Sequence, residues 1–172
     1  YGFTVSSIQT ILEDGERISS SALRSALAQG DMNQAEKLLG RPYGISGHVI
    51  HGRQLGRQLG FPTLNLAVAN HLHHRKPATT GIFTAQVIGL ADKPLPAVAS
   101  LGVRPTVEDE GRVLLETHIF DYQEDVYGKI ITVELLEKIR DEAKYSDLDT
   151  LTKAIASDAA HARNYFQKKT YV

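Results

Sequence analysis

GHVIHGRQLGRQLGFPTLN, residues 47–65, is the stretch at which the hydrophobic pattern of this chain changes. Before it, apolar residues recur at helical spacing; after it, they alternate with polar residues, as in strands with one buried face. The stretch begins with a short β-branched segment and continues with glycines at Gly52, Gly56 and Gly60. It therefore predicts the entry into a β-structure through a glycine-rich loop.

The segments 83–87, 97–101, 113–119 and 131–135 alternate apolar and polar residues with a period of two. Turn signals rich in Gly and Pro separate these four or five expected strands, and no helical pattern lies between them. Parallel strands require a long crossover connection, usually a helix. The pattern therefore favours an antiparallel sheet, closed as a small barrel.

Helical patterns flank this β-region on both sides. Any of the serines at 19–21 can cap a helix that Gly30 ends, and Asp31 can cap a second helix over residues 32–39. The two helices form a short hairpin that is too small to bury a core alone, so it is expected to pack on another part of the protein. Residues 146–149 read as a capping box that opens a long final helix, expected to lie across the barrel.

Composition limits the possible functions. The chain has 172 residues, enough for one well-buried domain, and a formal net charge of −1 with scattered Lys and Arg, which argues against a nucleic-acid or membrane surface. The absence of cysteine excludes disulfides, thiolate catalysis and Cys-based zinc sites. No apolar run reaches the length of a membrane span and no signal peptide is recognisable, so we expect small-molecule partners and a cytoplasmic location.

The glycine-rich stretch contains the ingredients of a phosphate and metal site. Glycines permit positive φ and close approach of the backbone to an anion, while Arg53 and Arg57 offer donor forks to phosphate oxygens. After Pro62, the neutral oxygens of Thr63 and Asn65 face the same way if the chain is extended, which suits Mg²⁺. Because neither common phosphate-loop motif is present, an ordinary hairpin loop with a surface Thr and Asn fits these residues equally well.

Glu116 is the sharpest candidate for catalysis outside this stretch. It lies in mid-strand on the face of Leu114, His118 and Phe120, where a carboxylate costs free energy unless it is paired or used, for example as a general base. The common alternative is that this face points to solvent. Asp158 interrupts the apolar stripe of the last helix, and the pattern favours an edge position over a buried site.

Six ordered motifs resemble the bacterial riboflavin kinase family. They are the stretch 47–65 and the segments 80–83, 100–106, 115–119, 125–128 and 139–140. The resemblance covers residues 44–167 and implies a mainly β fold, a six-stranded antiparallel barrel with a C-terminal helix, here preceded by the short helical hairpin. It also implies transfer of the γ-phosphate of ATP to the 5′-hydroxyl of riboflavin, giving FMN and ADP.

The resemblance implies roles for the glycine-rich stretch. Thr63 and Asn65 fall where the family binds Mg²⁺ and the nucleotide phosphates. Gly52, Gly56 and Arg57 fall around the bound ATP. The metal site read from the residues and the site implied by the resemblance therefore coincide.

The resemblance also assigns residues on the flavin side. Glu116 falls on the catalytic base of the family, while Arg140, Glu142 and Tyr145 fall on its flavin-side loop. Leu64 departs from the Ala that is common in the motif Pro-Thr-Ala-Asn, and we expect this to change packing without loss of the metal site. A non-catalytic flavin-binding or regulatory module is the alternative.

The first 43 residues resemble the tail of the FMN adenylyltransferase domain that precedes the kinase in bifunctional bacterial FAD synthetases, through residues 18–24 and 38–43. The expected division is therefore an adenylyltransferase remnant at 1–43 and a kinase domain at 44–172. The rest of the first domain is not in this sequence. Adenylyltransferase activity is accordingly not expected from this chain.

Overall fold

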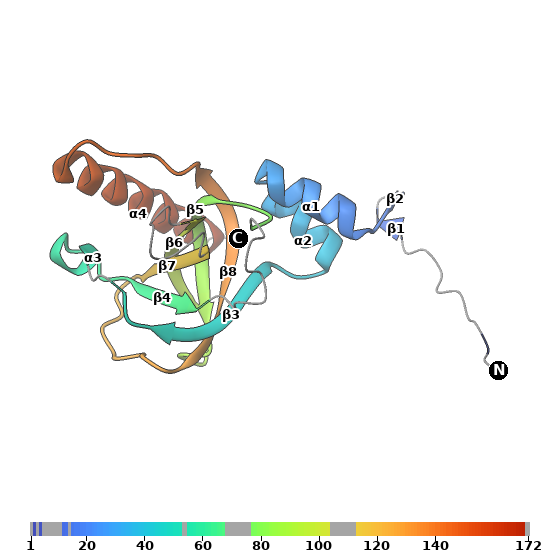
Figure 1. The fold of residues 1–172 in the computed structure, drawn as a ribbon, viewed down its shortest axis with the longest axis horizontal. Helices are drawn as coiled ribbons and strands as arrows, with labels where there is room; N and C mark the ends of the chain where they lie inside the picture. The colour runs from blue at the N-terminus through green and yellow to red at the C-terminus, as the bar shows by residue number, and fades with distance from the viewer. Residues whose placement is uncertain are drawn as a thin grey trace.

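Six antiparallel strands form a closed barrel in the computed structural model, which describes residues 2, 4, 12–13, 15–52, 55–67, 77–103 and 113–170. Around the barrel the strand order is β3-β4-β7-β6-β5-β8 (Figure 1). The strands are β3 (Tyr43–Ile50), β4 (Leu64–Ala67), β5 (Gly81–Ile88), β6 (Leu95–Val103), β7 (Val113–Ile119) and β8 (Ile130–Arg140). The predicted six-stranded antiparallel barrel is confirmed.

The interior of the barrel is aliphatic with one large aromatic side chain. Phe83, Ala85 and Val87 of β5 point inward and are fully buried. They belong to one apolar cluster with inward residues of the other strands, including Leu66, Leu101, Leu115, Ile131, Val133 and Leu135. Because side chains alternate along a strand, the residues between these project from the outer surface.

Two helices precede the barrel, α1 (Ser20–Gln29) and α2 (Met32–Leu39). The Ser19 side chain accepts a hydrogen bond from the Ala22 amide at 3.1 Å, and Asp31 caps α2 by accepting from the Gln34 amide at 2.9 Å. Gly30 ends α1 with φ 75°. The helical hairpin is therefore confirmed, and its apolar side joins the barrel cluster through residues such as Ala35.

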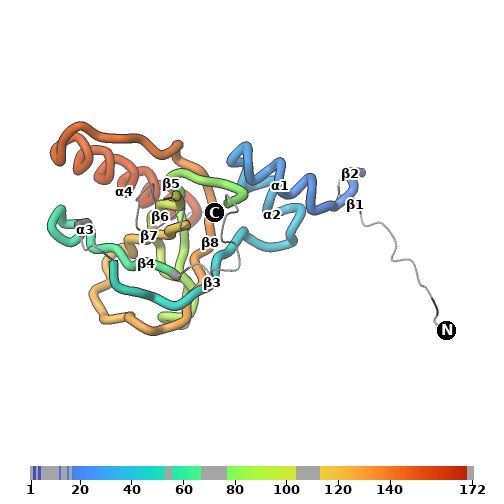
Figure 2. Tube along the Cα trace, viewed as in Figure 1, coloured from blue at the N-terminus to red at the C-terminus, as the bar shows by residue number. Residues whose placement is uncertain are grey.

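The last helix, α4 (Leu148–Thr170), packs on the outer surface of β5 and β6. Asp147 accepts a hydrogen bond from the Thr150 amide at 2.7 Å, which caps its first turn. Ala159 and Ala162 of α4 form a second apolar cluster with Val98 and Phe120. Figure 2 shows α4 in red and the blue helical hairpin on different sides of the barrel.

Two short elements complete the described structure. The strands β1 (Leu12–Glu13) and β2 (Glu16–Arg17) pair with each other and stand apart from the barrel. A single helical turn, α3 (Leu55–Gln58), lies between β3 and β4. The second half of the glycine-rich stretch therefore folds as a helical turn followed by β4.

Candidate functional site

A row of outward-facing residues crosses five strands of the barrel. Asn65 on β4 lies opposite Glu116 on β7, and Glu116 lies opposite Ser100 on β6. Ser100 in turn lies opposite Ile82 on β5, which lies opposite Arg140 on β8. Directly opposite residues of antiparallel strands project to the same face. The row thus brings Asn65 and Arg140, which are far apart in sequence, onto one surface with Glu116 between them.

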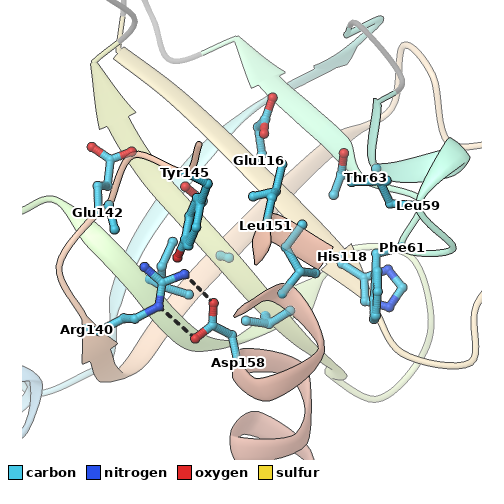
Figure 3. A pocket seen from close by; sticks show the side chains of 17 residues that line it. Leu59, Phe61, Thr63, Glu116, His118, Arg140, Glu142, Tyr145, Leu151 and Asp158 are labelled. Atoms are coloured by element: carbon cyan, nitrogen blue, oxygen red, sulfur yellow. Dashed lines mark hydrogen bonds and ion pairs between the residues drawn. The ribbon is translucent and has the colours of Figure 1, made fainter. Parts of the chain in front are cut away.

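A pocket of about 250 Å³ lies over this row, between the barrel and α4 (Figure 3). Its apolar walls come from the glycine-rich stretch, from β5 and β6, and from α4: Leu59, Phe61, Ile82, Val98, Ala99, Leu151 and Ile155. Its polar lining comes from the residue just before β4, from β6, β7 and β8, from the loop after β8 and from α4: Thr63, Ser100, Glu116, His118, Arg140, Glu142, Tyr145 and Asp158. An apolar slot with a few converging polar groups is typical of a small-molecule site.

A second pocket of about 550 Å³ adjoins the first. Its lining includes Arg57, Thr63 and the segment from Tyr122 to Tyr127. Thr63 lies on the walls of both pockets. Two molecules bound in the two pockets would therefore approach each other beside this residue.

The glycines of residues 47–65 lie against the predicted metal ligands. A Cβ at Gly52 would overlap the side-chain amide of Asn65, and a Cβ at Gly56 would overlap the Phe61 carbonyl oxygen and lie 3.3 Å from Thr63 Oγ1. Only Gly60, with φ 84°, has the left-handed conformation that the sequence suggested for these glycines. Gly52 and Gly56 are needed for space and not for positive φ.

Asn65 is 3% exposed, and its Oδ1 has no hydrogen-bond partner among the residues that the structure describes. A buried amide oxygen without a partner costs about 1–3 kcal/mol, so it is available to accept a ligand that lies beside it. Mg²⁺ takes neutral and anionic oxygen ligands. Asn65, with Thr63 two residues earlier, therefore fits the ion that the sequence predicts.

The outer face of β7 is covered in part: Glu116 faces outward, as the solvent-facing alternative has it, but it lines a pocket. Glu116 is half-buried, and Phe120 is only 6% exposed, packed in the cluster under α4. His118 lies between them on the same face. A carboxylate at this position thus opens into a pocket with an apolar lining.

Arg140 and Asp158 form a two-pronged ion pair at the other end of the row. Arg140 Nε and Nη2 donate to the two Asp158 carboxylate oxygens at 2.9 and 2.6 Å, as the dashed lines in Figure 3 show. The Asp158 carboxylate raises the pKa of Arg140. Asp158 is 6% exposed, so the predicted edge position on α4 is wrong. The signal was a carboxylate in an apolar stripe, and its partner could not be read from α4 alone.

Glu142 and Tyr145 lie on the loop between β8 and α4. The Glu142 carboxylate lies against Gly102 of β6, where a Cβ would overlap it. Burial raises the pKa of Glu142; Arg140 lowers it and Glu116 raises it. The guanidinium of Arg140 lies 5.8 Å from the centre of the Tyr145 ring. The loop thus directs acidic and aromatic groups toward the side of the pocket that contains Glu116.

His118 is a site residue that the sequence did not single out. Its Nδ1 donates a hydrogen bond to the Pro62 carbonyl oxygen at 2.8 Å, and its ring meets the Phe61 and Phe120 rings edge-on, each at 5.6 Å between centroids. Pro62 directly precedes Thr63. His118 therefore joins the strand of Glu116 to the end of the glycine-rich stretch, and its place on the face of Glu116 was the signal for it.

Most of the predicted site residues line one of the two pockets, and Thr63 lines both. Most lie on the first pocket: Gly56, Thr63, Glu116, Arg140, Glu142 and Tyr145. Arg57 lies on the second pocket, and Gly52 and Asn65 contact each other next to Glu116. Arg53 lies outside the described residues.

Comparisons with known proteins agree on one family. The family model of riboflavin kinase matches residues 39–166. The bifunctional riboflavin kinase/FMN adenylyltransferase of Escherichia coli K12 is 46% identical over 166 residues, which cover 96% of this chain and 51% of that protein. Its namesake from Pseudomonas fluorescens is 43% identical, over 94% of this chain and 50% of that protein. The chain spans about half the length of these curated relatives.

Solved structures support the same fold. The crystal structure of riboflavin kinase from Trypanosoma brucei matches with a TM-score of 0.51 at 26% identity, over 74% of this chain and 81% of that chain. A structure from Streptococcus pneumoniae described as a macrolide-efflux protein matches with a TM-score of 0.76 at 32% identity, over 91% of this chain and 50% of that chain. The word efflux belongs to the description of that structure, and the family model that matches this chain describes a riboflavin kinase.

The described ranges contain no helix with the length and hydropathy needed to cross a membrane.

The family match covers most of the chain, and the curated relatives share both its sequence and the name riboflavin kinase. The sequence prediction of membership in the riboflavin kinase family is thereby confirmed. The chain belongs to the riboflavin kinase family.

Proposed function

We propose that this chain binds riboflavin in the pocket under α4 and ATP in the adjoining pocket, and transfers the γ-phosphate to the ribityl 5′-hydroxyl. The products are FMN and ADP. The observation that carries this proposal is that Thr63 lies on both pockets while Glu116 lies on the first. Phosphoryl transfer depends on bringing the acceptor hydroxyl and the γ-phosphate into line, and two pockets that meet at one residue supply that arrangement.

The pocket under α4 suits a flavin. Its apolar walls, which include Phe61 and Leu151, match the flat ring system, while Arg140, Glu142 and Tyr145 offer polar groups to the edge of the ring. A ring held in this way would leave the ribityl chain to run toward Glu116 and Thr63. The flavin-side roles predicted for Arg140, Glu142 and Tyr145 are therefore part of the proposal.

The adjoining pocket would hold the nucleotide. Arg57 lines it and can donate to phosphate oxygens, and the missing side chains of Gly52 and Gly56 leave the backbone close to Asn65 and Thr63. Backbone groups that approach a ligand closely are a common way to hold phosphates. These residues keep the ATP-binding roles that the sequence predicted; Arg57 lines this pocket, Gly56 lines the first pocket next to Thr63, and Gly52 lies against Asn65.

Thr63 and Asn65 would hold Mg²⁺ through their side-chain oxygens. The unpartnered Oδ1 of buried Asn65 supports this assignment. When bound, Mg²⁺ neutralises charge on the phosphate oxygens and helps to orient the γ-phosphate. The protein supplies the neutral oxygens and the glycine-lined space around them.

Glu116 would act as the general base. Its carboxylate would accept the proton of the 5′-hydroxyl as that oxygen bonds to the γ-phosphorus, and the bond from the γ-phosphorus to the ADP oxygen breaks. Its position directly opposite Asn65 puts the base beside the predicted metal ligand. His118, through the Pro62 carbonyl, would keep Thr63 in place.

For the longer protein, we infer that residues 1–43 end an FMN adenylyltransferase domain and residues 44–172 form the kinase domain. The support is that the curated relatives carry both activities in their names and match this chain over about half their length. Adenylyltransferase activity is not expected from this chain by itself. We expect a cytoplasmic location, where flavin cofactors are made and used.

The test is to incubate the chain with riboflavin, ATP and Mg²⁺ and to follow FMN and ADP. Equal amounts of both products, with no reaction when Mg²⁺ is chelated, are expected. Tight riboflavin binding without ATP-dependent turnover would instead indicate the non-catalytic flavin-binding module, an alternative that the family match does not favour. Formation of FAD from FMN and ATP would contradict the assignment of residues 1–43.

A further inference from the structure

The Arg140 guanidinium is held by protein acceptors on all three of its nitrogens. Nε and Nη2 donate to the two carboxylate oxygens of Asp158, and Nη1 donates to the Asp141 carbonyl oxygen at 3.0 Å. A group held at three points has little freedom to follow a substrate. Its orientation is therefore fixed by the protein, while one N–H on Nη1 and one on Nη2 remain to face the flavin.

Asp158 is an unusual residue for its place on α4. Its carboxylate is 6% exposed, and the next residue, Ala159, is buried in the apolar cluster with Val98 and Phe120. Burial of a carboxylate costs free energy that the two-pronged pair with Arg140 offsets, and packing alone would favour an apolar residue here. The most direct effect of Asp158 is therefore to fix the orientation of the Arg140 side chain.

The loop that follows Arg140 carries the predicted flavin contacts. Residues 141–147 connect β8 to α4 and include Glu142 and Tyr145, both on the pocket. The same guanidinium bonds the first residue of this loop and lies 5.8 Å from the Tyr145 ring. Arg140, the last residue of β8, thus contacts both the loop and α4.

We propose that Asp158 is a positioning residue for the flavin substrate: by clamping Arg140, it holds the 141–147 loop so that Glu142 and Tyr145 face the pocket. This inference rests on the proposed riboflavin site. The clamp lies away from the nucleotide side, because none of Asp158, Arg140 and the loop lines the second pocket. Loss of the clamp should therefore weaken riboflavin binding and leave ATP binding unchanged.

The chain offers a control pair on the same helix, with the same two-pronged geometry but an exposed carboxylate. Arg163 donates from Nη1 and Nη2 to the two oxygens of Asp121 at 2.8 and 3.0 Å, so it forms a second two-pronged pair with a residue just after β7. Neither residue lines either pocket. Asp121→Asn removes one charge from a helix-anchoring pair, as Asp158→Asn does, but at a distance from the flavin.

The experiment compares Asp158→Asn with Asp121→Asn in steady-state kinetics and in riboflavin binding followed by fluorescence quenching. In Asp158→Asn, the riboflavin KM and Kd should rise about tenfold, since small misplacement of binding groups is costly, while the ATP KM stays within about twofold. Asp121→Asn should leave all three constants within about twofold. Asp158→Glu, which restores the carboxylate, should recover part of the riboflavin affinity.

Several results would overturn the inference. They are an unchanged riboflavin KM and Kd in folded Asp158→Asn, or equal rises in the constants for riboflavin and ATP. If Asp158→Asn does not fold, Arg140→Lys keeps the charge but loses the two-pronged contact, and an unchanged riboflavin Kd in that variant would also overturn it. A wild-type chain that binds riboflavin but makes no FMN would instead refute the proposed kinase reaction, and the binding comparison would still test Asp158.

Discussion

The inner and outer faces of β7 differ in what their side chains contact. Inward-facing Leu115 and Ile119 are buried in the aliphatic cluster that every barrel strand contributes to. Outward-facing Glu116 and His118 line the pocket, and their cross-strand or hydrogen-bonded neighbours come from the glycine-rich stretch. Apolar contacts of the inner kind repeat on every strand of the barrel. The polar contacts of the outer face of β7 lie at the pocket.

The period of two therefore separates stability from chemistry along a single strand. A substitution on the inner face should change the free energy of unfolding with little effect on turnover per folded molecule. A substitution on the outer face should do the reverse. The following predictions test this separation, from the largest expected effect to the smallest.

Phe83→Ala should be the most destabilising of these changes. Phe83 is 0% exposed and is the largest side chain of the barrel interior, so its truncation should lower the free energy of unfolding by about 3–5 kcal/mol. Urea denaturation measures this loss. Ile88→Ala, on the outward side of the same strand, serves as control and should cost less than about 1 kcal/mol. Equal losses would break the distinction between the two faces.

Glu116→Gln should lower kcat about 100-fold or more, because the proposed general base is lost, and should leave the urea midpoint close to that of the wild type. The kinetics follow FMN formation at saturating riboflavin and ATP. Asp92→Asn, in the exposed turn between β5 and β6, removes one negative charge elsewhere and should keep wild-type kcat. Near wild-type turnover in Glu116→Gln would mean that another group accepts the proton.

Gly52→Ala should raise the half-saturating Mg²⁺ concentration about tenfold, since the new methyl group would displace the Asn65 amide from its place. Titration of activity with Mg²⁺ at fixed ATP measures this effect. Gly40→Ala places a Cβ at a glycine with φ 68°, far from the pockets, and should cost stability without changing the Mg²⁺ requirement. An unchanged requirement in Gly52→Ala would remove Asn65 from the metal site.

The smallest expected effect is a pH dependence of stability from Glu142. Burial raises its pKa above the usual 4.5, so the folded protein binds the proton more tightly than the unfolded chain. This contribution to stability is fully present below the unfolded pKa and is lost as the pH rises through the folded pKa. As the pH rises through that range, the melting temperature of the wild type should therefore fall relative to that of Glu142→Gln. Parallel curves for the two proteins would contradict a raised pKa.

The sequence predicted the fold well because its signals are local. The caps at Ser19 and Asp31 and the stop at Gly30 act within one helical turn, and the alternation in each strand depends only on which neighbours are apolar. The motif resemblance then supplied the number of strands and the reaction. The roles of individual site residues remain predictions that the pockets support.

Other features required the closed barrel. The edge position expected for Asp158 was wrong because its partner, Arg140, lies on a strand that packs beside α4 only in three dimensions. The place of His118 on the face of Glu116 could be read from the sequence, but its contact with the Pro62 carbonyl required the tertiary structure. The sequence offered two uses for the glycines at 52 and 56, positive φ and close approach of the backbone; neither has positive φ, and each leaves space that Asn65 or Thr63 and the Phe61 carbonyl occupy.

By itself, the sequence determined the helices, the alternation of the strands, the family and the identity of the candidate catalytic and metal-binding residues. Only the tertiary structure decided which outward-facing residues share one row, and that Thr63 belongs to two pockets. The reason is physical: caps and alternation depend on neighbours in the chain, whereas the row depends on strand pairing. Pairing places β4 and β8 on one surface only when β7, β6 and β5 are paired between them.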